Sequence, residues 1–444
     1  MTPPFHSPSS PRRSPVGTGL VPFLCCLIAL AAAVACAATP KTPEPEPRPL
    51  SDGAALSVIQ RVERDTMAVR GLSLKGDLKV FILDSATLRH LIDADFEQSF
   101  PDRKRHAVER FLRSLRIIPD NVDLKEMFES LLDEQVGGLY DPETKRLYVR
   151  EGYDIVGSGF ARTVLSHEIC HALQDAAYDL KKIGIDSPDN DDLAEAATTV
   201  TEGDATVEMG EYVMRFEPKG ILEDLPKQSM MNQSALDKTP YFFRQMLLYP
   251  YIQGQVFVMK AIAKGPTWRN YLFTHPPTTT RQVIHPDRYF GHLDVPAPLA
   301  LLTTQTAAAR KVPGRAGVEP PLPPDPPRGY RRMEVNRLGE LGIRLLLEER
   351  LGMGVAMLAS EGWNGDAYLI CEDPQGRSWF CLETAWDTPR DALEFLGAWV
   401  TLWQSIAGDP SIGDRLARNQ DFTAGQWKVH VESAGNRLVS VWYN

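Results

Sequence analysis

Cysteine is scarce in this chain of 444 residues, which contains six in all. Half of them fall in an N-terminal leader, and the rest of the chain holds Cys170, Cys371 and Cys381. Three cysteines cannot form the disulfide framework that stabilises small secreted domains, so that class of fold is excluded. Cys371 and Cys381 flank an expected hairpin and could pair in an oxidising compartment; the alternative is that both are small buried residues.

Runs of like charge are also absent. The formal net charge of -10 is spread along the chain and forms neither an acidic tail nor a basic stripe. Nucleic acid and an anionic membrane surface are therefore not expected partners. The chain shows no internal repeats and no coiled-coil periodicity, so it predicts no particular oligomeric state. With 43% hydrophobic residues it can bury a sizeable core, and its length predicts two domains once a leader is removed.

The first residues have the pattern of a signal peptide. Arg12 and Arg13 precede an apolar run over residues 20–35 that ends in small residues. The end of the run, AVAC at 33–36, could be cut after an Ala-x-Ala site, or it could be a lipoprotein signal in which Cys36 carries a lipid anchor. An uncleaved anchor is a third alternative, because the run approaches the shortest spanning length of about 17 residues. All three predict an exported protein that is periplasmic, a membrane-anchored lipoprotein, or secreted.

Two proline-rich stretches divide the chain. TPKTPEPEPRP at 39–49 is charged and has almost nothing to bury, so it reads as a semi-rigid spacer. VPGRAGVEPPLPPDPPR at 312–328 reads as an interdomain linker for the same reason. The predicted units are a signal peptide at 1–36, a spacer at 37–53, a large first domain at 54–292, a linker at 293–329 and an accessory domain at 330–444.

Hydrophobic periodicity predicts a mixture of helices and strands in both domains. Helices are expected over residues 56–67, 104–115, 124–133, 159–177, 191–214 and 389–404. Strands are expected over residues 78–83, 136–140, 146–149, 356–358, 367–371, 379–382, 429–433 and 437–442. The predicted fold class is α+β, with a small α+β accessory domain following the first domain.

The sequence HEICH at 167–171 lies inside the helix expected over 159–177. Positions i and i+4 of a helix point to the same face, so His167 and His171 can reach one ion at about 2.0–2.1 Å. Glu168 is then placed to touch a water molecule at that ion and to carry its proton to a leaving amine. The alternative is a helix with two unrelated histidines and a surface glutamate.

A catalytic zinc site needs a third protein ligand and an open fourth position. No histidine follows HEICH at the spacing of the metzincins, but Glu202 lies in TEGDAT at 201–206, on the next expected helix. Glu202 is therefore the predicted third ligand. Glu195 and Glu208 lie about two turns away on either side and are rivals, and any of the three could simply face water.

The combination of SHEICHALQD at 166–175 and TEGDAT resembles the gluzincin-type zinc metallopeptidases, especially a bacterial group related to minigluzincins. Further segments with this likeness are GGLYDPETKRLYV at 137–149, YPYIQGQVFV at 249–258 and PPTTTRQVIHPDRY at 276–289. The resemblance covers about residues 130–290 and implies a zincin-like domain. It also implies that substrate binds antiparallel to an edge strand near residues 147–150, in keeping with β-augmentation.

Other residues near the motif have open roles. Cys170 could ligate a metal, but its position three residues after His167 favours a small buried residue. Asp204 could orient a histidine through its second ring nitrogen. Hydrolysis also needs a group that stabilises the oxyanion, and the candidates are Tyr249, Tyr251, His275 and His285. His285 lies in a family-like segment and is the predicted residue; a structural histidine that bonds a loop is the alternative.

The sequence therefore predicts an exported, zinc-dependent metallopeptidase with Glu168 as general base and a peptide or protein as substrate. A non-catalytic envelope binding module that keeps zinc for stability is a second hypothesis. Glu168 favours catalysis, because a structural zinc site has no need of a base. An amidase acting on cell-wall peptides would use the same chemistry and is a third hypothesis.

Overall fold

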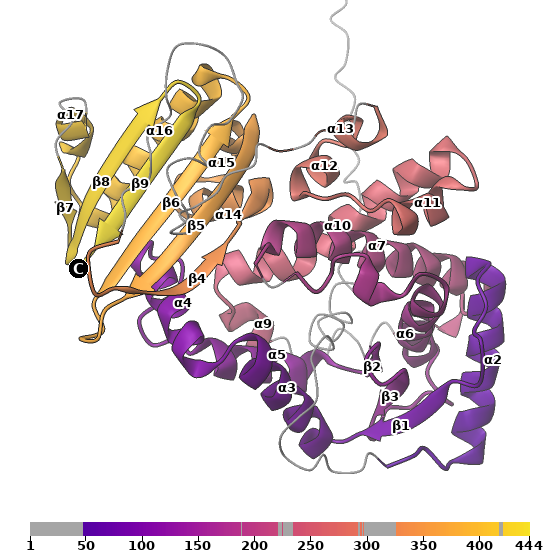
Figure 1. Ribbon diagram of the computed structural model, residues 1–444. Coiled ribbons are helices and arrows are strands. Elements are labelled where there is room, and N and C mark those ends of the chain that lie inside the picture. The colour runs from indigo at the N-terminus through magenta and orange to yellow at the C-terminus, as the bar shows by residue number, and fades with distance from the viewer. Residues whose placement is uncertain are drawn as a thin grey trace, which may run out of the picture.

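The computed structural model describes residues 48–187, 189–220, 224, 234–291, 294, 296, 326–416 and 421–444. The chain forms a mixed α+β fold with two sheets (Figure 1). The leader, Cys36 and most of the predicted spacer and linker lie outside the described residues, so the predictions made for them stay predictions. No helix within the described residues is both long and apolar enough to cross a membrane.

A three-stranded sheet has the order β1-β3-β2. Its strands are β1 (Lys79–Leu83), β2 (Gly138–Asp141) and β3 (Arg146–Arg150). The turn between β2 and β3 forms the predicted hairpin, and β1 pairs with β3 in parallel. Helices α2 (Gly53–Arg70) and α6 (Gly159–Tyr178) share a hydrophobic cluster with the sheet, so the sheet and α6 form one packed unit.

An antiparallel six-stranded sheet forms the C-terminal part, in the order β4-β5-β6-β9-β8-β7. Its strands are β4 (Arg331–Asn336), β5 (Trp363–Glu372), β6 (Ser378–Trp386), β7 (Phe422–Ala424), β8 (Trp427–Ala434) and β9 (Arg437–Tyr443). Helices α14 (Gly339–Leu351), α15 (Met353–Ser360) and α16 (Pro389–Ala407) belong to the same part of the fold. Thr388 and Asp391 form a capping box at the start of α16.

Two long helices, α7 (Asp191–Phe216) and α10 (Tyr241–Lys264), run through the middle of the molecule between the two sheets (Figure 1). The remaining elements are α3 (Ser85–Ser99), α4 (Asp102–Ser114), α5 (Leu124–Gln135), the 3-10 turn η1 (Leu180–Lys182), α9 (Ser234–Lys238), α11 (Trp268–Thr274), α12 (Thr280–Ile284), α13 (Asp287–Phe290) and α17 (Ile412–Leu416).

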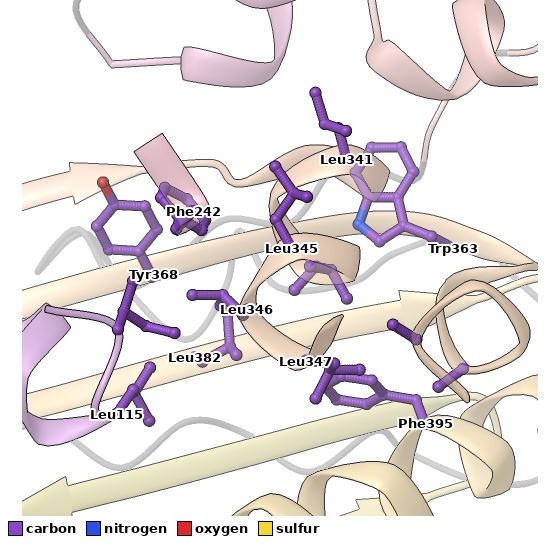
Figure 2. Packing of buried hydrophobic residues seen from close by; sticks show 14 of the residues in the cluster. Leu115, Phe242, Leu341, Leu345, Leu346, Leu347, Trp363, Tyr368, Leu382 and Phe395 are labelled. Carbon is purple, nitrogen blue, oxygen red and sulfur yellow. The ribbon is translucent and has the colours of Figure 1, made fainter. Parts of the chain in front are cut away.

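The largest hydrophobic cluster joins both parts of the molecule (Figure 2). Leu115 after α4 and Phe242 of α10 pack in the same cluster as Leu346 of α14, Tyr368 of β5 and Leu382 of β6. Four of these side chains are at most 5% exposed, and Phe242 is 8% exposed. Burial of this kind contributes about 25 cal/mol per Å² of apolar surface. The core therefore crosses the expected boundary between the two domains.

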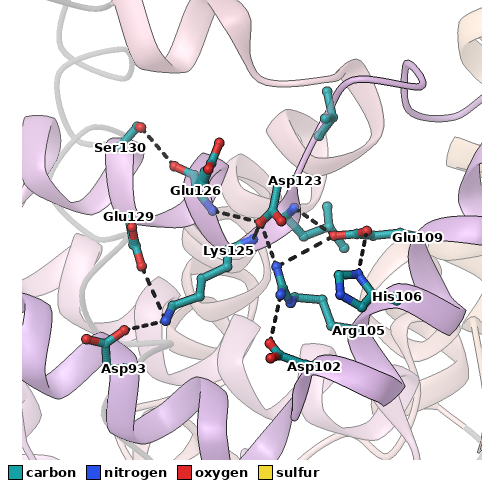
Figure 3. Close-up of polar contacts among 12 residues, drawn as sticks. Asp93, Asp102, Arg105, His106, Glu109, Asp123, Lys125, Glu126, Glu129 and Ser130 are labelled. Atoms are coloured by element: carbon teal, nitrogen blue, oxygen red, sulfur yellow. Dashed lines mark hydrogen bonds and ion pairs between the residues drawn. The ribbon is translucent and has the colours of Figure 1, made fainter.

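A polar network fixes α4 against α5 (Figure 3). Asp123 is the N-cap of α5 and accepts hydrogen bonds from the backbone N–H groups of Lys125 and Glu126. The same carboxylate accepts from Arg105 of α4 at 2.6 Å, and buried Glu109 accepts from the backbone N–H of Leu124 at 3.0 Å. The start of α5 is thereby attached to α4, which in turn packs on the six-stranded sheet.

One predicted element is wrong. Residues 356–358 were expected to form a strand, but they lie inside α15. Only Ala356, Ala359 and Ser360 of α15 are buried, and its other apolar side chains are exposed. The pattern of a short apolar run is compatible with either a strand or a helix. Here Gly352, with φ of 81°, lies between the end of α14 and the start of α15.

Candidate metal centre

Helix α6 carries the HEICH sequence in its interior. Ser158 caps the helix by accepting a hydrogen bond from the backbone N–H of Ala161, and the helix has no proline to interrupt it. His167, Glu168 and His171 are all buried, being at most 2% exposed. The predicted helix over 159–177 is therefore confirmed, and it presents the two histidines from adjacent turns.

Helix α7 brings Glu202 to the histidines. Asn190 caps its start by accepting a hydrogen bond from Leu193 N–H. A close approach of α7 to α10 follows at Gly203, where an added Cβ would lie 2.2 Å from the carbonyl carbon of Gly254. Only glycine permits this contact, so the residue after Glu202 fixes the distance between the two helices.

The donor atoms of His167, His171 and Glu202 lie within 4.8 Å of one another. His167 Nε2 is 3.1 Å from Glu202 Oε2 and 3.1 Å from His171 Nε2, and His171 Nε2 is 3.3 Å from the same Glu202 oxygen. All three residues are buried, and no further His, Cys, Asp or Glu of the described ranges joins the group. This cluster could bind a metal ion.

Charges within the cluster are strongly coupled. Burial alone would raise the pKa of Glu202, but the charge of His171 and the hydrogen bonds from both histidines lower it to about 2. Burial would likewise lower the pKa of His171, and the charge of Glu202 outweighs it and raises this pKa. Burial lowers the pKa of His167. The site thus holds an ionised carboxylate against the two rings, in the state that a metal ligand requires.

Glu168 faces the cluster without belonging to it. Its Oε2 accepts a hydrogen bond of 2.9 Å from the backbone N–H of Tyr140, the third residue of β2, and its Oε1 has no partner among the described residues. Burial raises the pKa of Glu168 to about 8, and the charge of His171 partly opposes this effect. A buried carboxyl with one restrained and one free oxygen is suited to accept and return a proton.

A second layer of polar groups lies behind His171. Its Nδ1 is 2.9 Å from Gln174 Oε1, and Gln174 Nε2 donates to Asp204 Oδ2 at 2.8 Å. Asp204 also accepts from Arg70 and Arg269. Asp204 was a candidate to orient a histidine through its second ring nitrogen, and the structure places Gln174 between Asp204 and His171. The spacing of three residues from His171 to Gln174 was a signal the sequence offered, because i and i+3 are neighbours on a helix.

The residues considered as oxyanion stabilisers lie at different distances from the cluster. Tyr251 of α10 is buried, and its ring lies 6.2 Å from that of His167. Burial raises its pKa, as do the charge of Glu202 and a hydrogen bond to it. His285 forms a hydrogen bond of 2.7 Å to Glu340 of α14, and none of its described contacts reaches the cluster. The predicted role of His285 therefore finds no contact in the structure, and His275 is exposed and stacked on Tyr271.

Cys170 and the rival glutamates stay outside the cluster. Cys170 is buried, and its Sγ lies 3.7 Å from Gln174 Nε2. Glu195 and Glu208 each have buried oxygens without a partner among the described residues, but neither is among the three donors. Cys371 and Cys381 are both free and buried. They lie diagonally in the ladder, because Cys371 faces Trp379 and Cys381 faces Leu369, so the suggested disulfide is wrong.

The edge of the sheet lies on a different strand from the one expected. Residues 147–150 belong to β3, which is the central strand of its sheet and pairs on both sides. The edge beside Glu168 belongs to β2. Arg150 N–H donates to Gly137 C=O, so the alternate residues Gly138 and Tyr140 point their backbone groups away from β3. Tyr140 N–H reaches Glu168 in this way, and the remaining groups lie on the side of the buried strand β2 that pairs with no strand of the described residues.

Comparison with known proteins gives two similarities. Residues 328–442 match the family model described as "Domain of unknown function (DUF8575)". A solved structure from Chloroflexus aurantiacus, titled as that of "a putative hydrolase with a novel fold", has 17% sequence identity and a TM-score of 0.36, covering 54% of this chain and 91% of that chain. A likeness at this level carries no argument about fold or activity. No curated protein matches the chain.

Proposed function

We propose that this protein is an exported zinc-dependent metallopeptidase of the gluzincin type. The observation that carries the proposal is the triangle of His167 Nε2, His171 Nε2 and Glu202 Oε2, with sides of 3.1, 3.1 and 3.3 Å. Ligands at 2.0–2.1 Å from a tetrahedral ion are about 3.3 Å apart. The three atoms thus have the spacing of one face of a tetrahedral site.

The donor set also fits zinc in its chemistry. Two imidazole nitrogens and one carboxylate, with no fourth protein donor in the described residues, correspond to the His₂Glu set of catalytic sites that keep one position open. A structural zinc site closes its fourth position with another side chain. This difference favours a catalytic centre over the zinc-containing binding module. When bound, zinc supplies Lewis acidity, which polarises a carbonyl group and eases the deprotonation of water.

Glu168 and β2 supply the other parts of the reaction. The free Oε1 of Glu168 would accept a proton from the attacking water and return it to the leaving amine, while Tyr140 N–H holds Oε2 in place. Gly138 N–H, Gly138 C=O and Tyr140 C=O could pair with an extended peptide lying antiparallel to β2. Tyr251 is the proposed donor to the oxyanion, in place of His285.

The proposal is tested by measuring zinc content and peptide hydrolysis together. The native protein should hold about one zinc and cleave members of a mixed fluorogenic peptide library. Glu168→Gln should hold the same zinc and lose the cleavage. If both proteins hold zinc and neither cleaves peptides, the binding-module hypothesis replaces this one; cleavage of cell-wall peptides alone identifies the amidase. If neither protein holds zinc, the proposal is wrong.

Export is tested separately from the chemistry. Fractionation of the producing cells should recover the protein outside the cytoplasm, and a Cys36→Ser variant shows whether a lipid anchor retains it on the membrane. Recovery of the native protein in the cytoplasm would contradict the predicted leader.

A further inference from the structure

We infer that Asp204 and Gln174 are positioning residues that hold the proton of the neutral His171 ring on Nδ1. Nε2 is then the nitrogen that can bind a metal ion together with His167 and Glu202. The inference rests on the proposed function, since it concerns the ability of His171 to bind zinc. Neither Asp204 nor Gln174 contributes one of the three donor atoms of the cluster. Both are nevertheless 0% exposed, and they link His171 to two arginines on other helices.

Asp204 is the acceptor on which the network converges. Its Oδ2 accepts from Arg70 Nε of α2 at 2.7 Å and from Gln174 Nε2 at 2.8 Å, and its Oδ1 accepts from Arg269 Nε of α11 at 2.5 Å. A guanidinium group can only donate hydrogen bonds, so the two arginines require both oxygens of the Asp204 carboxyl group to act as acceptors.

An acceptor-only Asp204 fixes the amide of Gln174. Gln174 Nε2 also lies 3.0 Å from the backbone oxygen of Thr201, a second group that can only accept a hydrogen bond. The NH₂ group of Gln174 must point to these two oxygens, so its Oε1 points to His171 Nδ1. A flipped amide would put oxygen against oxygen at Thr201 and Asp204.

The orientation of Gln174 then sets the tautomer of His171. Gln174 Oε1 lies 2.9 Å from Nδ1 and can only accept, so Nδ1 carries the proton. A metal ion binds the neutral imidazole, in which the other nitrogen is then the acceptor, so Nε2 would present its lone pair on the side of His167 and Glu202. A proton on Nε2 would block the metal position. The arginines thus act on the metal ligand through two intervening side chains.

The network also connects the two helices that supply ligands. Gln174 lies one turn after His171 on α6, and Asp204 lies two residues after Glu202 on α7. Arg70 and Arg269 bring in α2 and α11, and the Arg70 side chain is 1% exposed. A polar residue that merely filled space would not need two buried ionic partners, which are costly to desolvate. Two partners that can only donate keep both oxygens of Asp204 as acceptors, which is what the amide of Gln174 requires.

The inference is tested by zinc affinity, measured by competition with a chromophoric chelator. Gln174→Leu deletes the link to His171 but leaves both arginine pairs of Asp204 in place. Asp204→Asn puts an NH₂ group where an acceptor is required, so Gln174 is no longer fixed. Each variant should bind zinc about 10- to 100-fold more weakly than the native protein, as expected for outer partners of metal ligands.

Coupling between the variants distinguishes positioning from a structural role. The double variant should bind zinc no more weakly than Gln174→Leu alone, because Asp204 acts only through Gln174. Glu211→Gln is the matched control: Glu211 pairs with Arg269 at the exposed end of the same network, and its change should leave zinc affinity unaltered. Thermal unfolding of the metal-free proteins verifies that each variant is folded.

Two results would overturn the inference. Zinc affinity of Gln174→Leu within twofold of the native value overturns it, and this variant decides the matter alone if Asp204→Asn does not fold. Additive losses in the double variant also overturn it. Absence of zinc binding by the native protein is a different failure, which rejects the proposed function itself.

Discussion

At the scale of single residues, two tyrosines of α10 have different surroundings although they are two positions apart. Tyr251 lies beside His167 and Glu202. Tyr249 is also buried, but its hydroxyl has no partner among the described residues. Two positions on a helix differ by about 200°, so the two hydroxyls point to different neighbours. Of these two tyrosines, Tyr251 is the one beside the cluster.

Tyr251→Phe should lower kcat for peptide hydrolysis by about 100- to 1000-fold with little change in KM. The reason is that loss of one oxyanion donor removes stabilisation that exists only in the transition state. Steady-state kinetics and zinc content are the measurements. Tyr249→Phe is the control, and its activity should match the native value because the lost hydroxyl has no partner to leave unpaired. A loss of zinc rather than of kcat would show that Tyr251 holds Glu202 instead.

Much of the site could be predicted at this scale because its chemistry follows helical spacing. His167 and His171 lie four residues apart on one helix, and the sequence alone brings them together. Glu202 lies on a second helix, so its distance along the chain made it the predicted ligand but left Glu195 and Glu208 as rivals. The choice between Tyr251 and His285 was not available from the sequence, since it depends on how α10 and α12 are rotated against α7.

At the scale of elements, the crossing of α7 and α10 sets the position of Glu202. Gly203 and Gly254 meet backbone to backbone: a Cβ on Gly203 would lie 2.2 Å from Gly254 carbonyl carbon, and a Cβ on Gly254 would lie 2.2 Å from Thr199 C=O. The two segments that carry these glycines, TEGDAT and YPYIQGQVFV, both belong to the family-like part of the sequence. Their glycines meet at one contact.

Gly203→Ala should destabilise the protein and weaken zinc binding. The new methyl group collides with backbone and forces the helices apart, at a cost of about 1–3 kcal/mol or more, which exceeds the helix propensity of about 1 kcal/mol gained from alanine. Urea unfolding and zinc competition are the measurements. Gly210→Ala on the same helix is the control: its Cβ would meet nothing within 4 Å, so this change should stabilise. Equal effects of both changes would refute the role of the crossing.

Elements with strong periodicity or capping could be predicted, and others could not. The helices at 159–177 and 191–214 matched α6 and α7 because each combines an N-cap with a long stretch free of proline. Helix α10 contains Pro250, which hides its length from the sequence. The β2 edge was missed because pairing in the sheet depends on β1, a strand distant along the chain.

At the scale of the whole molecule, the start of α7 is attached to the C-terminal part. Asn336 of β4 accepts a hydrogen bond from Asp191 N–H at 2.8 Å and donates one of 2.8 Å to the Asp191 side chain. Asp192 accepts two hydrogen bonds from Thr280, and it lies where a Cβ on Gly339 would collide with it. The helix that carries Glu202 is thus held at its N-terminus by residues of both parts.

Stability should fall as pH rises between about 4 and about 7. Burial raises the pKa of Asp192 to about 7, with Asp366 and Glu340 adding to the shift against the hydrogen bonds from Thr280. The folded protein then binds more protons than the unfolded chain in this window. The stabilisation is therefore fully present below the pKa that Asp192 has in the unfolded chain, and it is lost as pH rises through the higher pKa that Asp192 has in the folded protein. A one-unit shift corresponds to about 1.4 kcal/mol.

Asp192→Asn isolates this effect. The amide oxygen can still accept from Thr280, but the group no longer ionises, so the free energy of unfolding should change less between pH 5 and pH 8 than in the native protein. Urea unfolding at both pH values measures the difference, which should be roughly 1–4 kcal/mol. Identical pH profiles for the two proteins would show that Asp192 does not titrate in this range.

Zinc should also stabilise the whole fold. An ion that binds only the folded protein adds about 2.7 kcal/mol when its concentration is 100 times Kd. Removal of the metal with a chelator should therefore lower the midpoint of thermal unfolding, and added zinc should restore it. Glu202→Ala should abolish this response, because one of the three donors is gone. If the chelator does not change the midpoint of thermal unfolding of the native protein, this result contradicts the metal centre.

The shared core has a consequence for how such a gene can change over generations. Phe242 and Leu115 share one buried cluster with Leu346 and Tyr368, and Asn336 donates a hydrogen bond to Asp191, so each half presents a surface shaped by the other. Recombination that exchanged only residues 326–444 would leave these side chains without their counterparts. The two halves are therefore expected to be inherited together, and substitutions on one side should be accompanied by matching substitutions on the other.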